Sequence, residues 1–141
     1  MTIIQAKTQA EREMCFALRR AVFMAEQGVT PADEWDGLEG ACHHFLALDG
    51  DMPTATARLR PIGPDAKLQR VAVARSHRGS GLGGQILRHV LDFARSQGFA
   101  TVRLEAQITA IAFYTGLGFV AHGPEFDDAG IAHRAMSLHL R

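Results

Sequence analysis

The fold of this chain is decided by residues 67–84, which read KLQRVAVARSHRGSGLGG. The first half alternates as a β-strand does, which places Leu68, Arg70, Ala72 and Ala74 on one face and Gln69, Val71 and Val73 on the other. A glycine-rich loop follows. Apolar residues then recur at helical spacing as far as Gly98, namely Leu82, Ile86, Val90, Phe93 and Ala94. The stretch therefore predicts a strand, a glycine loop and a helix in that order.

Regular elements are predicted on both sides of this unit. Residues 8–11, Thr-Gln-Ala-Glu, have the form of a capping box and predict a helix that continues toward Gly28. Strand patterns flank the turn dipeptide Asp49-Gly50. We expect strands at 2–6, 41–48, 54–60, 101–106, 119–122 and 133–140, and a short helix at 108–117. Strands before, between and after helices predict an α/β fold with a mixed sheet, and no linker divides residues 1–141, which we expect to form a single domain.

The glycine loop has the features of an anion site. Glycines let the backbone turn tightly and bring N–H groups together beside the positive end of the following helix. Arg78, immediately before Gly79, adds a guanidinium suited to phosphate. A P-loop is excluded because no lysine follows Lys67. A Rossmann fingerprint matches Gly79–Gly84 as a motif, but about 43 residues after Gly98 are too few for its second half, and a plain turn is the remaining alternative.

Composition excludes several classes of partner. Fifteen basic side chains balance fifteen acidic ones, so no global field attracts nucleic acid or anionic membranes. No apolar run is long enough to span a membrane, and we expect a cytoplasmic protein. Cys15 and Cys42 lack metal or redox spacing, and adjacent strand residues in Cys42-His43-His44 point to opposite faces, so we expect no metal site.

These motifs resemble the GNAT superfamily of acyl-CoA N-acyltransferases, whose signature is Arg or Gln, two residues, Gly, one residue, then Gly or Ala. Here the signature is Arg78 to Gly83. The predicted order of elements agrees from Thr2 to Leu140, and the second half carries Ala106-Gln107, Ala112-Phe113-Tyr114 and Gly118-Phe119. Within the superfamily the chain is most similar to the ElaA-like and YjcF-like branch.

The resemblance implies a mixed, mostly antiparallel central sheet flanked by helices, with acetyl-CoA as the acyl donor. It implies that the strands beginning near Leu68 and Thr101 splay apart, leaving the N–H of Val73 to bind the thioester carbonyl. The residues it assigns to the donor are Val71, Ala72, Val73, Arg78, Gly79, Ser80, Gly81, Leu82, Gly83, Gly84, Gln107, Phe113 and Tyr114.

Transfer to an amine by direct attack needs an acid for the departing thiolate and a route for the amine proton. The resemblance places Tyr114, the only tyrosine, near the sulfur as general acid; the alternative is a core aromatic. His133 and Glu26 are the candidate bases, because imidazole titrates near neutrality and an apolar cleft can raise the pKa of a carboxylate. A structural strand histidine and an ion pair of Glu26 with Arg19 or Arg20 are the alternatives, and a water chain could replace a dedicated base.

For the acceptor, the candidate binding residues are Arg19, Glu26, His44, Arg58 and His133. The acidic residues 33, 34 and 36 favour a cationic amine or form a merely solvated loop. Two functions stay open: an acetyltransferase acting on a small-molecule or protein amine, and a non-catalytic acyl-CoA-binding or sensing module. A pyridine-nucleotide enzyme is a third alternative, and a homodimer is left open as the assembly.

Overall fold

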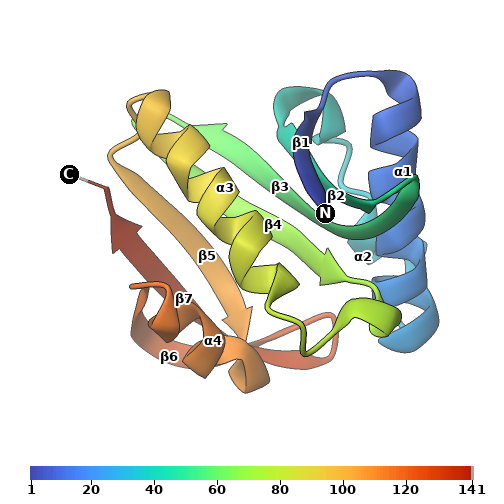
Figure 1. Ribbon diagram of the computed structural model, residues 1–141. Coiled ribbons are helices and arrows are strands. Elements are labelled where there is room, and N and C mark those ends of the chain that lie inside the picture. The colour runs from blue at the N-terminus through green and yellow to red at the C-terminus, as the bar shows by residue number, and fades with distance from the viewer. Residues whose placement is uncertain (141) are drawn as a thin grey trace.

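The central sheet has seven strands in the order β1-β2-β3-β4-β5-β7-β6 (Figure 1). The computed structural model describes residues 1–140, apart from the side chains of residues 32 and 33. The strands are β1 Thr2–Ala6, β2 His43–Asp49, β3 Met52–Ile62, β4 Asp65–Val73, β5 Thr101–Gln107, β6 Val120–Asp128 and β7 Ile131–His139. The β4–β5 pair is parallel and the other neighbours are antiparallel, which confirms the expected mixed, mostly antiparallel sheet.

Helices cover both faces of this sheet. They are α1 Gln9–Arg19, α2 Pro31–Glu34, α3 Leu82–Ser96 and α4 Ile111–Gly116, with η1 Arg20–Glu26, η2 Glu39–Ala41, η3 Arg75–His77 and η4 Ile108–Ala110 as shorter or irregular turns. The larger core lies between α3 and alternate residues of β2 to β5, while Cys15 and Leu18 of α1 pack on Ala6 and Leu46 on the opposite face. None of the helices in residues 1–140 is long and apolar enough to cross a membrane.

The first helix begins as its sequence predicts. The Thr8 hydroxyl accepts from the Glu11 N–H, and the Glu11 carboxylate accepts from the Thr8 N–H, both within 3.1 Å. After Arg19 the helix widens into the π-helical segment η1, and Gly28 ends it with a φ of +72°. π-Helical turns are often found at functional sites. Here the wider turn carries Phe23 to the cavity described below.

The β2–β3 hairpin and the helix α3 are confirmed at the expected positions. Gly50 occupies the hairpin turn with a φ of +60°. In α3 the predicted apolar residues are buried, except that Phe93 is only partly buried against the same core, and Gly98, with a φ of +81°, follows the helix end. These local patterns are reliable because each is built from residues close together in sequence.

The penultimate strand is longer than the sequence predicts. A strand was expected only at 119–122, yet β6 continues to Asp128. Gly123 and Pro124 interrupt the pattern, and the register shifts between His122 and Phe126. Glycine and proline are tolerated there because β6 is an edge strand, where a bulge and a missing N–H disturb no second neighbour.

Candidate active site

The site begins where β4 and β5 separate. The two parallel strands pair only at Ala66–Val102 and Lys67–Arg103, and they then diverge (Figure 1). On the other side of β4, the N–H of Ala74 donates to the Thr54 carbonyl at 2.8 Å. Because N–H groups alternate along an antiparallel strand, the N–H of Val73 points away from β3 and into this gap. The splayed strands expected from the sequence are therefore present.

A β-bulge in β4 changes which side chains face the gap. Between the pairs Thr56–Ala72 and Arg58–Gln69, β4 has one more residue than β3. Arg70 lies at this bulge with a φ of +54°, a backbone conformation that L-residues seldom adopt. The prediction of strict alternation from Leu68 to Ala74 was therefore wrong: the bulge moves Val71 and Val73 onto the face that packs against α3, with Leu68.

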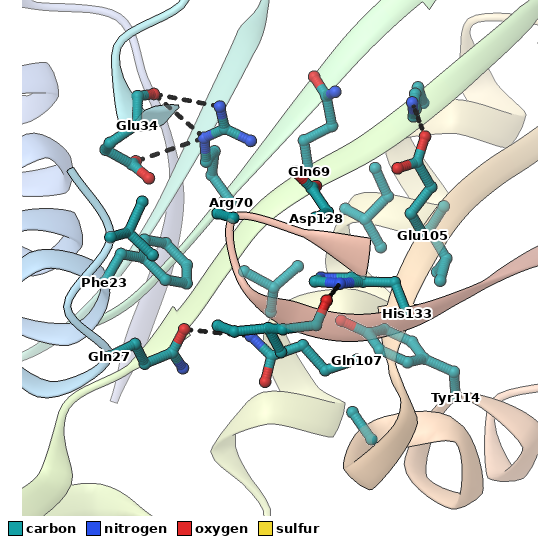
Figure 2. Close-up of a pocket in the computed structure, with 18 residues that line it drawn as sticks. Phe23, Gln27, Glu34, Gln69, Arg70, Glu105, Gln107, Tyr114, Asp128 and His133 are labelled. Carbon is teal, nitrogen blue, oxygen red and sulfur yellow. Dashed lines mark hydrogen bonds and ion pairs between the residues drawn. The ribbon is translucent and has the colours of Figure 1, made fainter. Parts of the chain in front are cut away.

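A cavity of about 260 Å³ occupies the gap (Figure 2). Its walls come from η1, the α2 segment, β4, β5, the turn before α4, α4 itself and the β6–β7 hairpin. The lining residues are Phe23, Gln27, Val29, Glu34, Lys67, Leu68, Gln69, Arg70, Val71, Leu104, Glu105, Gln107, Ala110, Tyr114, Asp128, Ala129, Ile131 and His133. The cavity thus brings together the predicted residues Val71, Gln107, Tyr114 and His133.

Tyr114 enters the cavity from α4. Its ring packs edge-to-face against Phe113 and Phe119, and Figure 2 shows its hydroxyl end directed toward the space that His133 also lines. Burial raises the pKa of Tyr114 to about 12. The phenol is therefore protonated throughout the neutral range, the state in which it can donate a proton.

His133 enters the same cavity from β7. Its Nδ1 lies 2.7 Å from the Ile131 carbonyl oxygen. A carbonyl can only accept, so Nδ1 carries the hydrogen and the neutral ring presents the lone pair of Nε2. Phe126 stacks on the ring at 6.0 Å. The imidazole is thus held in the tautomer that can accept a proton.

The glycine loop lies beside the end of β4. Gly79 and Gly81 have φ values of +78° and +83°, and a Cβ at either position would meet nothing within 4 Å. The N–H of Gln85 donates to the Gly81 carbonyl at 3.1 Å, so the N–H groups of residues 82–84, which precede it in the first turn of α3, have no acceptor within the helix. The loop therefore offers open space and amide donors, which fits a phosphate group.

Arg78 lies at the junction of this loop with β4. Its Nε donates to the Val73 carbonyl at 3.0 Å, and its two terminal nitrogens contact the Glu26 carboxylate at 2.8 and 3.0 Å. Hydrogen bonding from Arg78 lowers the pKa of Glu26. Glu26 was considered as a base because an apolar cleft can raise the pKa of a carboxylate. The lowered pKa of Glu26 removes that reason. Its partners are Arg78 and Arg75, rather than Arg19 or Arg20.

The similarity to known proteins agrees with this geometry. Residues 20–140 match the acetyltransferase (GNAT) domain family. The chain belongs to the GNAT family. It is 36% identical over 137 residues to the uncharacterised N-acetyltransferase YjcF of Bacillus subtilis, covering 96% of this chain and 98% of YjcF.

Two solved structures extend the comparison. An acyl-CoA N-acyltransferase from Pseudomonas aeruginosa has a TM-score of 0.85 at 30% identity, with 96% of each chain covered. ElaA from Escherichia coli has a TM-score of 0.83 at 26% identity, again with 96% of each chain covered. Both the fold and the expected ElaA-like and YjcF-like branch are confirmed. GNAT enzymes transfer an acyl group from an acyl-CoA to an acceptor, and this chain is an N-acyltransferase of that family.

Three residues expected to bind the acceptor lie elsewhere in this GNAT fold. Arg19, His44 and Arg58 are each 2% exposed or less and do not line the cavity. Arg19 pairs with Glu34 at 2.7 Å and with Glu39 at 2.9 Å. The expectation that these side chains face the acceptor cleft was therefore wrong. Sequence could not reveal this, because a buried ion pair and a surface charge look alike in one dimension.

These buried residues belong to a cluster of opposite charges. Arg58 contacts both oxygens of Asp36, at 2.7 and 3.0 Å, and these hydrogen bonds hold the pKa of Asp36 well below its usual range. Burial lowers the pKa of His44, whose Nε2 lies 2.9 Å from the Glu39 carbonyl oxygen. The cluster ties the segment around α2 to the sheet. The side chain of Asp33, the remaining acidic residue of that segment, lies outside the described residues.

Several cavity residues were not predicted as site residues. Glu105 and Asp128 contribute carboxylates, and Lys67 and Arg70 contribute cations, beside Glu34, whose acidic segment was expected to face the acceptor. Lys67 pairs with Glu105, and Arg70 contacts Glu34 at 3.3 Å. No local motif distinguishes these residues, since they meet only when separate elements pack together.

Unusual backbone geometry also marks this cavity. Within residues 1–140, Arg70 and Ala129 are the non-glycine residues with positive φ, at +54° and +53°. Both line the cavity, one at the β4 bulge and the other in the β6–β7 turn. Such conformations cost about 1–2 kcal/mol each and tend to cluster at functional sites.

Proposed function

We propose that the chain transfers an acetyl group from acetyl-CoA to a primary amine by direct attack, without an acetylated enzyme. The observation that carries this proposal is the convergence of Tyr114 and His133 on one cavity, which lies in the gap between β4 and β5 into which the N–H of Val73 points. An acid, a base and an oxyanion donor are the groups that aminolysis of a thioester requires.

In this proposal the donor lies along β4 and the glycine loop. The amides around Gly81 to Gly84 receive its pyrophosphate, and the backbone of Val71 to Val73 pairs with its pantetheine arm. The ring of Phe113 lies beside this loop, because a Cβ built on Gly83 would be 3.4 Å from it. This position fits the expected role of Phe113 in binding the donor. A cavity of about 260 Å³ that also admits the acceptor favours a short acyl group.

The chain's own residues then account for each proton. The amine nitrogen forms its bond to the thioester carbonyl carbon, and the N–H of Val73 stabilises the negative charge on the oxygen. His133 takes the amine proton at Nε2. Tyr114 gives its hydroxyl proton to the sulfur as the carbon–sulfur bond breaks. The products are an amide and the free thiol, and the proton that His133 took from the amine returns to Tyr114 through water, which restores both side chains.

The acceptor in this proposal is a cationic amine, either a small molecule or an exposed protein amine. Glu34 and Glu105 are paired with cations, whereas Asp128 has no ion-pair partner within the described part of the chain. An unpaired carboxylate at the cavity attracts an ammonium group. Arg19, His44 and Arg58 are left out of the acceptor site because they are buried in the charge cluster.

The test is release of thiol from acetyl-CoA in the presence of a library of amines. The proposal is supported if thiol is released when an amine is present and is not released when the amine is left out. His133→Asn should slow this turnover more at neutral pH than at high pH, because more of the amine is already neutral at high pH. Binding of acetyl-CoA without turnover across the library would favour the non-catalytic acyl-CoA-binding module instead.

A further inference from the structure

The guanidinium of Arg78 is already occupied by an anion. All three of its nitrogens make contacts: Nε with the Val73 carbonyl, and Nη1 and Nη2 with the two oxygens of Glu26. The contact with Glu26 is bidentate, the geometry in which a guanidinium best holds a carboxylate or a phosphate. Glu26 therefore fills the face of Arg78 that a phosphate would use.

Glu26 reaches this position from a distant part of the chain. It is the last residue of η1 and lies 52 residues before Arg78. The hydrogen bond from Arg78 lowers its pKa, so the carboxylate is charged at neutral pH. A second cation, Arg75, lies 3.8 Å away with a side chain that is 79% exposed. Glu26 thus has another partner within reach if Arg78 turns away.

We propose that Glu26 is an internal competitor for the donor: it holds Arg78 in the free protein, and the pyrophosphate of acyl-CoA displaces it. This inference rests on the proposed donor site at the glycine loop. One guanidinium edge cannot hold two bidentate anions at once, so donor binding exchanges one for the other. Arg75 receives the released carboxylate, which keeps the exchange from leaving an unpaired charge.

The same exchange uncovers the end of β4. In the free protein Arg78 donates to the carbonyl of Val73, which points into the gap along with the N–H of that residue. When Arg78 turns to the phosphate, this carbonyl becomes available to the pantetheine arm. Only molecules in which Arg78 is released bind the donor fully. The apparent affinity for the donor is therefore the intrinsic affinity multiplied by the fraction of molecules in that state.

The experiment is calorimetric titration of CoA into the full chain and its variants at low ionic strength. Glu26→Gln removes the competing charge with little change in shape, and should tighten CoA binding by about threefold to tenfold, the range for an exposed ion pair together with its neighbours. Glu13→Gln is the matched control, since Glu13 lies on α1 and pairs with Arg20 at 3.9 Å. It should leave the affinity within about twofold.

A double-mutant cycle tests whether Glu26 affects CoA binding through Arg78. In an Arg78→Ala background, Glu26→Gln should change the affinity by less than about twofold, because the group for which Glu26 competes is gone. Glu26→Asp has a shorter side chain that reaches Arg78 less well, so it should give an intermediate gain in CoA affinity. This variant replaces Glu26→Gln in the experiment if Glu26→Gln does not fold.

The outcomes separate this inference from the proposed function. If wild type binds CoA and Glu26→Gln weakens that binding or leaves it unchanged, Glu26 is not a competitor and the inference is wrong. An equal gain in the Arg78→Ala background would also overturn it, because the effect would be one of general charge. If no variant binds CoA, the donor site itself is wrong and the proposed function falls with it.

Discussion

The glycine loop, which we propose binds the donor, and the cavity, which we propose binds the acceptor, are built in different ways. The loop is one continuous stretch from Val73 to Gly84, and its features are backbone conformations that glycine permits. The cavity is assembled from η1, the α2 segment, β4, β5, α4 and the β6–β7 hairpin, and its features are side chains. The pyrophosphate is common to all acyl-CoA donors, so backbone N–H groups can bind it. An acceptor that is specific to one enzyme has to be recognised by side chains.

The bulge at Arg70 is where the two regions meet. It turns Val71 and Val73 toward the α3 face and places Arg70 in the cavity wall. If the loop binds the donor and the cavity holds the acceptor, substitutions in the cavity should change the transfer rate and leave the donor affinity unchanged. Substitutions in the loop should change the donor affinity.

The largest expected effect is that of Tyr114→Phe. The change keeps the ring that packs on Phe113 and Phe119 but removes the only proton that the side chain can give. The transfer rate should fall by about 10²–10⁴-fold, the usual contribution of general acid catalysis, with the acetyl-CoA affinity nearly unchanged. Single-turnover kinetics and calorimetry measure the two quantities, and a wild-type rate would return Tyr114 to a packing role.

A large loss of stability is expected for Arg19→Met. Removing this buried cation leaves the Glu34 side chain, which is 3% exposed, and Glu39 without their shared partner. Breaking a buried ion pair in this way costs about 3–5 kcal/mol in the free energy of unfolding. Urea denaturation measures it. Arg20→Met is the matched control, because Arg20 is 49% exposed and 3.9 Å from Glu13, and it should cost about 1 kcal/mol or less.

In the glycine loop, Gly81→Val should weaken acetyl-CoA binding by about 100-fold or more, because the side chain fills the space proposed for the pyrophosphate. Gly98→Val is the control at the other end of α3. Both glycines have φ near +80° and no atom within 4 Å of an added Cβ, so both variants carry similar backbone strain. Equal donor affinities in the two variants would remove Gly81 from the phosphate site.

The smallest expected effect is that of Ala129→Gly in the cavity wall. Alanine at a φ of +53° is strained by about 1–2 kcal/mol, and glycine removes that strain at an entropic cost of about 0.5–1 kcal/mol. The free energy of unfolding should rise by about 0.5–1 kcal/mol, with acetyl-CoA affinity unchanged. Thermal denaturation with parallel calorimetry checks both, and a destabilised variant would show that the alanine methyl group contributes more than its conformation costs.

Sequence patterns alone predicted the order of elements, the capping box at Thr8, the hairpin at Gly50 and the glycine loop after β4. Each of these depends on residues within a few positions of one another, whose conformational preferences act locally. The sequence also indicated the GNAT family, because the Arg78 to Gly83 signature stands in the right order of elements.

Which polar residues share a site became visible only from the packing of distant segments. Arg19 and Arg20 are neighbours in sequence, yet one is buried in the charge cluster and the other is half exposed. Glu26 was expected at a base position, and packing instead placed it on Arg78. The bulge at Arg70 reversed the expected faces of Val71 and Val73. Each outcome depends on contacts between segments far apart in the chain, which local preferences do not encode.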